Sequence, residues 1–250
     1  MLATKAFFSF TEVPDKADHR AYNEWHQLDH RPENLRLPGV AWGERWVRSP
    51  DCAAVAPPAD PSLSPLHYLN MYWFNDPVDT STKAWSALAE RTYQEGRRAD
   101  VHLARRLLMG FFRPIKGYVN QRVLVSEDVL PFRPSRGVYV SVTRVDEPRT
   151  PAAERYFGWH DRVHVPAVLG CQGVAGAWTF ASESTFESAL DLDGGVSPAS
   201  TRILLAFVDG DPLAAARSID ALPRADAAIA TELLRSPLRS INPWEWDWFD

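Results

Sequence analysis

Apolar residues alternate with polar residues in several short segments of this chain, and in other segments they recur at the spacing of an α-helix. In the first half this pattern predicts strands over residues 4–13, 40–48, 66–74 and 117–126, and helices over residues 18–35 and 78–109. In the second half it predicts strands over residues 137–145, 174–181, 202–208 and 238–241, and helices over residues 151–169 and 211–234. Each half therefore has the order β-α-β-β-α-β, which is the ferredoxin-like order.

Two irregular segments interrupt this pattern at matching places. Residues 49–65 are rich in proline and lack periodicity, and residues 182–200 are rich in serine, aspartate and glycine, so both are predicted loops. Residues 130–136 are the predicted linker between the halves. The tail, NPWEWDWFD, alternates tryptophan with acidic residues, and we expect it to pack against the fold rather than to form an edge strand.

The chain also repeats itself at an offset of 134 residues. Nine positions within a stretch of twenty are identical without a gap: Tyr22, Trp25, His26, His30, Pro32, Leu35, Gly39, Val40 and Ala41 match Tyr156, Trp159, His160, His164, Pro166, Leu169, Gly173, Val174 and Ala175. A fixed offset of this kind indicates duplicated architecture. We therefore expect two domains, residues 1–129 and residues 136–250.

The repeat also predicts how the halves assemble. A ferredoxin-like sheet carries its helices on one face, so its other face needs a cover, and a second copy of the same sheet is the natural one. The expected fold class is α+β, with two tandem ferredoxin-like units whose antiparallel sheets pack into a barrel within one chain.

Composition and charge limit the partners. The net charge is −5 and the acidic residues are spread along the chain, so no basic face is available for nucleic acid. No apolar run reaches the length of a membrane span, and no signal peptide is recognisable, so a cytoplasmic location is expected. Cys52 and Cys171 are expected to be free thiols.

The segment YNEWHQLDHRPENLRLPGV, preceded and followed by a predicted strand, resembles the dimeric α+β barrel superfamily, in particular its EthD-like branch. The segment FGWHDRVHVPAVLGCQGV resembles it again, with Gln172 in place of the proline. In the family, single units dimerise to form the barrel. The resemblance implies activity on small, apolar or aromatic molecules, by chemistries that range from cofactor-free monooxygenation and cyclisation to haem-dependent reactions.

The repeated histidines are the main candidates for chemistry. His26 and His30 are four residues apart, so they share one face of the helix, and Asp29 lies within reach of His26. An imidazole beside a carboxylate can take up and release a proton near neutral pH. The resemblance implies that the histidine of His-x-Pro points into the cavity between sheet and helices. We therefore expect His30 to be the acid or base, with Asp29 and His26 as supporting catalytic residues.

Other residues are expected around the same site. The predicted substrate-binding residues are aromatic side chains and the histidines of the second copy: Trp25, Trp46, Tyr68, Tyr72, His160 and His164. The segment EGRRADVHLARRLL is interpreted as a solvated face of a helix.

These features favour an enzyme of the lyase or isomerase type. It would perform cyclisation, isomerisation, dehydration or decarboxylation on an apolar aromatic or polycyclic substrate, without a cofactor, as a monomer or homodimer. One alternative is a metal- or haem-dependent oxidoreductase that uses the same histidines, although the HExxH and CxxCH motifs are absent. The other is a non-catalytic ligand-binding protein in which the histidines only support the scaffold.

Overall fold

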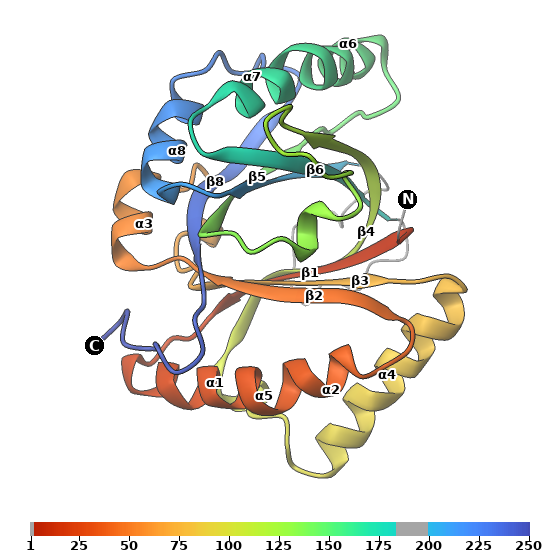
Figure 1. The fold of residues 1–250 in the computed structure, drawn as a ribbon, viewed down its shortest axis with the longest axis vertical. Coiled ribbons are helices and arrows are strands. Elements are labelled where there is room, and N and C mark those ends of the chain that lie inside the picture. Colours follow the sequence, from red (N-terminus) through yellow and green to blue (C-terminus); the bar gives the residue numbers. More distant parts are fainter. Residues whose placement is uncertain (1–2, 184–199) are drawn as a thin grey trace.

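The computed structural model describes residues 3–183 and 200–250. Eight strands form one closed antiparallel barrel in the order β1-β3-β2-β8-β5-β7-β6-β4. The strands are β1 (Lys5–Glu12), β2 (Val40–Val47), β3 (Tyr68–Phe74), β4 (Arg105–Val119), β5 (Gly137–Arg144), β6 (Val174–Ser182), β7 (Thr201–Val208) and β8 (Thr231–Ser240). Figure 1 shows the helices outside this barrel, with most helices of the first half on one side and those of the second half, together with the short helix Pro50–Val55 of the first half, on the other. The predicted fold class, two ferredoxin-like units forming one barrel, is confirmed.

The two halves repeat each other in strand order and in strand irregularities. The order is β4-β1-β3-β2 in the first half and β8-β5-β7-β6 in the second, so corresponding strands have corresponding neighbours. A β-bulge follows Val40 in β2 and follows Val174 in β6, at the same offset of 134 residues as the histidine motif. A second pair of bulges follows Phe10 in β1 and Val142 in β5. The shared registers make residues of the two halves equivalent one by one.

The barrel is closed by two unequal seams. β4 pairs with β1 through its first part and with β6 through Phe112–Val119, so this one strand belongs to both sheets. At the other seam, β2 and β8 share only two residue pairs, Trp46 with Ser240 and Val47 with Arg239.

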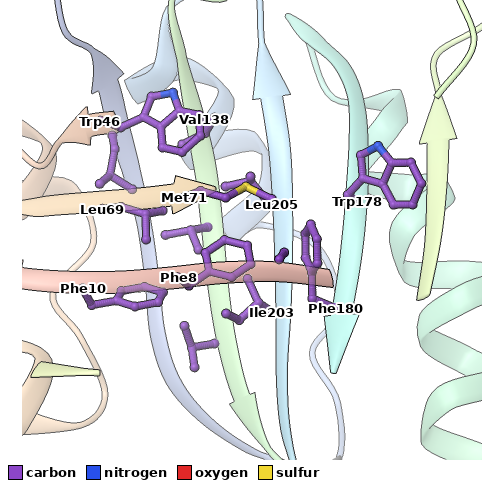
Figure 2. Close-up of a cluster of buried hydrophobic side chains, with 14 of the residues drawn as sticks. Phe8, Phe10, Trp46, Leu69, Met71, Val138, Trp178, Phe180, Ile203 and Leu205 are labelled. Carbon is purple, nitrogen blue, oxygen red and sulfur yellow. The ribbon is translucent and has the colours of Figure 1, made fainter. Parts of the chain in front are cut away.

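The core of the protein fills the interior of the barrel. Figure 2 shows side chains from both halves meeting there, among them Phe8, Trp46 and Phe180. The rings of Phe8 and Phe180 are 4.9 Å apart, and those of Trp73 and Trp178 are 5.1 Å apart. Burial of this aromatic surface accounts for the many tryptophans and phenylalanines of the composition.

Each half has one long helical segment that carries the histidine motif. In the first half it comprises α1 (His19–Trp25), the π-helical turn η2 (His26–His30) and α2 (Arg31–Leu35); in the second, α6 (Pro151–Trp159), the π-helical turn η5 (His160–His164) and α7 (Val165–Gly170). Thr150 caps the start of α6 by accepting a hydrogen bond from the amide of Ala153. These two helical segments were predicted correctly, whereas their π-helical turns were not.

Several predicted element boundaries are wrong. The proline-rich segment 49–65 contains α3 (Pro50–Val55) and the 3₁₀ turn η3 (Pro61–Leu63), because prolines are tolerated in the first turn of a helix. The predicted helix 78–109 consists of α4 (Val78–Gln94) and α5 (Asp100–Leu103), and β4 begins at Arg105 instead of residue 117. Of the predicted helix 211–234, only α8 (Pro212–Asp220) is helical, and β8 already starts at Thr231. In both cases pairing with a neighbouring strand overrides local helix propensity.

The remaining segments are short turns, one loop and the C-terminal tail. The linker contains the 3₁₀ turn η4 (Leu130–Phe132), and a 3₁₀ turn η1 (Lys16–Asp18) precedes α1. Most of the predicted loop 182–200 lies outside the described residues. The tail after β8 runs along the first half and ends beside α1 (Figure 1). Among the described residues, no helix is long and apolar enough to cross a membrane.

Candidate functional site

The first half contains a cavity of 380 Å³ between its helices and the outer face of its sheet. The histidine-bearing segment forms one wall, α4 another, and strands β1, β3 and β4 form the floor. Five of the predicted site residues line it: Trp25, His26, Asp29, His30 and Tyr72. The sequence motif and the cavity therefore coincide.

His26 occupies the inner part of this wall. It is 3% exposed, and its Nδ1 is buried without a hydrogen-bond partner. Burial, followed by the positive charge of Arg45, holds the pKa of His26 well below 6.5. The imidazole is therefore neutral at physiological pH and keeps a nitrogen lone pair.

His30 lies next to His26 and is held by its neighbours. Its ring stacks on Trp25 at 4.6 Å and lies 5.1 Å from the ring of His26. Asn34 Nδ2 lies 3.3 Å from the Nδ1 and 3.4 Å from the Nε2 of His30. Burial, followed by the nearby Arg98, lowers the pKa of His30 to about 3.

The π-helical turn explains why the two histidines meet at the cavity. It widens the helix over His26–His30, so both rings project from one bulged turn towards the sheet. Such turns are rare and occur frequently at functional sites. The same turn recurs at His160–His164 in the second half.

Asp29 has a different partner from the one expected. Its carboxylate accepts two hydrogen bonds from the Arg97 guanidinium, and the same guanidinium lies 3.0 Å from Glu33. Asp29 thus belongs to an ion-pair network at the rim of the cavity, and no hydrogen bond joins it to either histidine among the described residues.

Arg98 and Arg106 form a second ionic group at the cavity. Arg98 donates two hydrogen bonds of 2.9 Å to Asp100, and Arg106 donates to the same carboxylate. Two guanidinium groups therefore share one carboxylate, which leaves a net positive charge at the wall. The interpretation of residues 95–108 as a solvated helix face is wrong, because Asp100 is 4% exposed and both arginines line the cavity.

Tyr68, Tyr72 and Trp46 occupy three different environments. Tyr72 lines the cavity, with its ring lying against Gly43. Tyr68 lies outside the cavity, on the helix-facing side of β3 and against α1, where its hydroxyl is 2.8 Å from both His19 Nδ1 and Asn23 Nδ2. Trp46 points into the barrel, away from the cavity, because side chains alternate along β2 and its neighbour Arg45 faces the helices.

Arg45 is a buried residue that the sequence did not single out as part of this site. It is 1% exposed, donates to Asn23 Oδ1 and lies 5.2 Å from the ring of Tyr68. Alternation along β2 predicts that either Glu44 or Arg45 faces the helices, without deciding between them.

The second half has a smaller counterpart of the cavity, of 330 Å³, which is lined by His160 and His164. Burial lowers the pKa of His160 to about 4 and also lowers that of His164. Here Arg235 projects into the space and lies 3.1 Å from Asp220 and 2.6 Å from Glu232. Tyr139 also donates a hydrogen bond to Asp220, so the charged groups of this pocket neutralise one another.

Comparison with known proteins identifies the fold. No family model matches the sequence, and no curated protein matches it. Among solved structures, a candidate chlorite dismutase matches 97% of the chain over 96% of its own, with 13% identity and a TM-score of 0.54. An encapsulated DyP-type peroxidase from Mycobacterium smegmatis matches 100% of the chain over 95% of its own, with 10% identity and a TM-score of 0.55.

A dye-decolorizing peroxidase from Bacteroides thetaiotaomicron gives the same coverage and TM-score, with 9% identity. The fold is that of the dimeric α+β barrel proteins. At these identities the similarity shows the fold alone.

The neighbours nevertheless correct two expectations. They are peroxidases and a candidate chlorite dismutase, which are haem-dependent oxidoreductases and not lyases or isomerases. The expectation of proton-transfer chemistry without a cofactor is therefore wrong, and so is the expectation that no cofactor is needed.

Proposed function

We propose that this protein is a haem-dependent oxidoreductase and that the cavity of the first half holds the haem. The observation that carries the proposal is His26, a neutral imidazole in the cavity wall with a nitrogen that the protein leaves unpaired. Histidine is the axial haem ligand of peroxidases. Bound haem would supply one-electron and oxygen chemistry at this place.

The donor set fits haem better than a bare metal ion. Among the described residues, no group of three or more His, Cys, Asp or Glu side chains could hold a metal. The porphyrin of haem supplies nitrogen ligands to the iron, so the protein needs to supply only an axial ligand. One neutral histidine is therefore sufficient.

The walls of the cavity also suit a flat apolar group that carries carboxylates. Phe7, Trp85 and Phe111 pack against one another at the apolar end, with Phe7 and Trp85 4.8 Å apart. Arg98 and Arg106, which share one carboxylate, lie at the polar end and can each donate to an anionic substituent. His30, stacked on Trp25 in the same wall, would hold or pass a proton beside the bound group.

Haem binding is the direct test. Purified protein is titrated with haemin and followed by visible absorption, for the wild type, His26→Ala, His30→Ala and the matched control His160→Ala. We expect one equivalent to bind to the wild type, a loss or spectral change in the His26 variant, and wild-type behaviour in the control. An unchanged spectrum in the His26 variant, or loss only in the His160 variant, contradicts the assignment. Haem binding without turnover of peroxide would favour a non-catalytic binding protein.

We also infer that the halves, residues 1–129 and 136–250, arose by duplication of one EthD-like unit. The shared strand order, the repeated bulges and the repeated π-helical turns support this. The substrate would be a small apolar or aromatic molecule that the walls of the first cavity can contact.

A further inference from the structure

The second half has a further cavity, of 520 Å³, on the side of its histidine helix that faces β4, β6 and β7. Its position follows from the equivalence of the halves. The bulges and registers place Arg202 of β7 where the first half has Tyr68 of β3. The two halves differ in what lies beside this position.

In the first half the C-terminal tail covers Tyr68. The ring of Phe249 stacks on His19 at 4.0 Å and lies 6.1 Å from the ring of Tyr68. An aromatic side chain thus fills the space beside this strand. In the part of the second half that the structure describes, no segment does the same, and the cavity lies beside Arg202 instead.

The cation in this cavity has no ion-pair partner among the described residues, although Glu154 lines the same cavity and attracts Arg202 electrostatically. No described carboxylate forms an ion pair with Arg202 or with Arg113 in the same wall, and the Nε of Arg202 is buried without a hydrogen-bond partner. The carboxylate of Asp161 is already paired with Lys116 at 2.8 Å and bonded to Tyr118. A partly buried guanidinium without a partner is costly, so the site favours an anion.

The remaining wall favours an aromatic body. The guanidinium of Arg202 lies over the ring of Phe157 at 4.2 Å, and Ile115 and Leu204 complete an apolar surface. Carboxylates pair well with arginine because its guanidinium offers two parallel donors. We propose that this cavity binds a small aromatic carboxylate, with its ring against Phe157 and its carboxylate on Arg202.

Calorimetric titration with benzoate tests the proposal, with benzamide as the uncharged probe of the same shape. We expect benzoate to bind more tightly than benzamide to the wild type. Arg202→Met should weaken benzoate binding about 10- to 100-fold, because a charge-assisted hydrogen bond is lost. Phe157→Leu should also weaken it, since the ring contact is reduced.

Arg144→Gln is the matched control, because Arg144 lies on the neighbouring strand β5 but pairs with Asp146 outside the cavity. It should bind benzoate like the wild type. Equal affinity for benzoate and benzamide, equal affinity in the Arg202 variant, or no benzoate binding by the wild type would each overturn the proposal. If Arg202→Met does not fold, as judged by its melting curve, the comparison of the two probes on the wild type decides.

Discussion

Met109 of β4 and Arg235 of β8 occupy equivalent positions in the two halves, beside equivalent histidines. The registers establish this, because Met109 pairs with Ser9 and Arg235 pairs with Ser141. Arg235 brings its ion pairs into the second pocket, whereas Met109 places an apolar side chain at this point of the first pocket. This position thus carries an apolar side chain in the first pocket and part of a neutralised ionic network in the second.

Replacing Arg235 with Met should therefore destabilise the protein without creating a second apolar pocket. Asp220, which is 22% exposed, would lose its ion-pair partner, and Glu232, which is 30% exposed, would keep only Arg224 at 3.6 Å. We expect a loss of about 1–3 kcal/mol in the free energy of unfolding, measured by urea denaturation. Met109→Leu, the control at the equivalent position, should change it by less than about 1.5 kcal/mol. A neutral Arg235→Met variant would contradict this account of the pocket.

Gly43→Ala should disturb the first cavity through a single methyl group. A Cβ at this position would overlap the ring of Tyr72, which forms part of the cavity floor. Overpacking of this kind costs about 1–3 kcal/mol, and the displaced ring would also weaken ligand binding. Gly158→Ala is a suitable control, since a Cβ there meets nothing within 4 Å. Melting temperature and haem titration measure the two effects separately.

The sequence alone predicted the barrel and the helix that lines each cavity because both depend on patterns that repeat. The match of His26 and His30 with His160 and His164 was visible without coordinates, and it located the helix that lines each pocket. Strand alternation could not say which residues of β2 face outward. For that reason Trp46 was expected at the site, whereas Arg45 faces the helices.

The parts that the sequence did not predict depend on distant contacts. Arg98 and Arg106 reach the cavity only because β4 begins at Arg105 and pairs with β1, a pairing that local helix propensity hides. The choice of cofactor was equally out of reach. A histidine pair serves proton transfer and axial ligation alike, and nothing along the chain separates these uses.

Stability should fall as the pH is lowered below 6.5. His30 has a pKa of about 3 in the folded protein and an ordinary value of 6.5, so the unfolded chain binds more protons between these limits. Stability is thus complete above 6.5 and declines as the pH falls towards 3. At pH 5 the contribution of His30 to this loss is about 1–2 kcal/mol.

His30→Gln removes this proton uptake, so the difference in unfolding free energy between pH 7 and pH 5 should shrink by that amount. Urea denaturation at the two pH values provides the measurement. His102→Gln serves as a control on a short helix outside the cavity. An equal pH dependence in wild type and His30→Gln would show that His30 is protonated in the folded protein.

Asp29→Asn should change stability and haem binding only slightly, whereas loss of a catalytic residue would have a large effect. Its carboxylate is 31% exposed and pairs with Arg97, which keeps Glu33 and Glu95 as partners. An exposed pair of this kind contributes about 0–1 kcal/mol. We expect little change in melting temperature and an unchanged haem titration. A loss of haem binding in Asp29→Asn would instead show that Asp29 is needed to bind the ligand.

The unequal closure of the barrel makes the seam between β2 and β8 the weakest line of the wall. With only two residue pairs joining β2 to β8, the wall parts most easily along that line, while β4 keeps the sheets attached on the opposite side. Such an opening admits water to the interior of the cylinder but leaves the outer surface of each sheet in contact with its helices. Both histidine pockets lie on those outer surfaces, so opening of the seam between β2 and β8 would leave the contacts of each pocket in place.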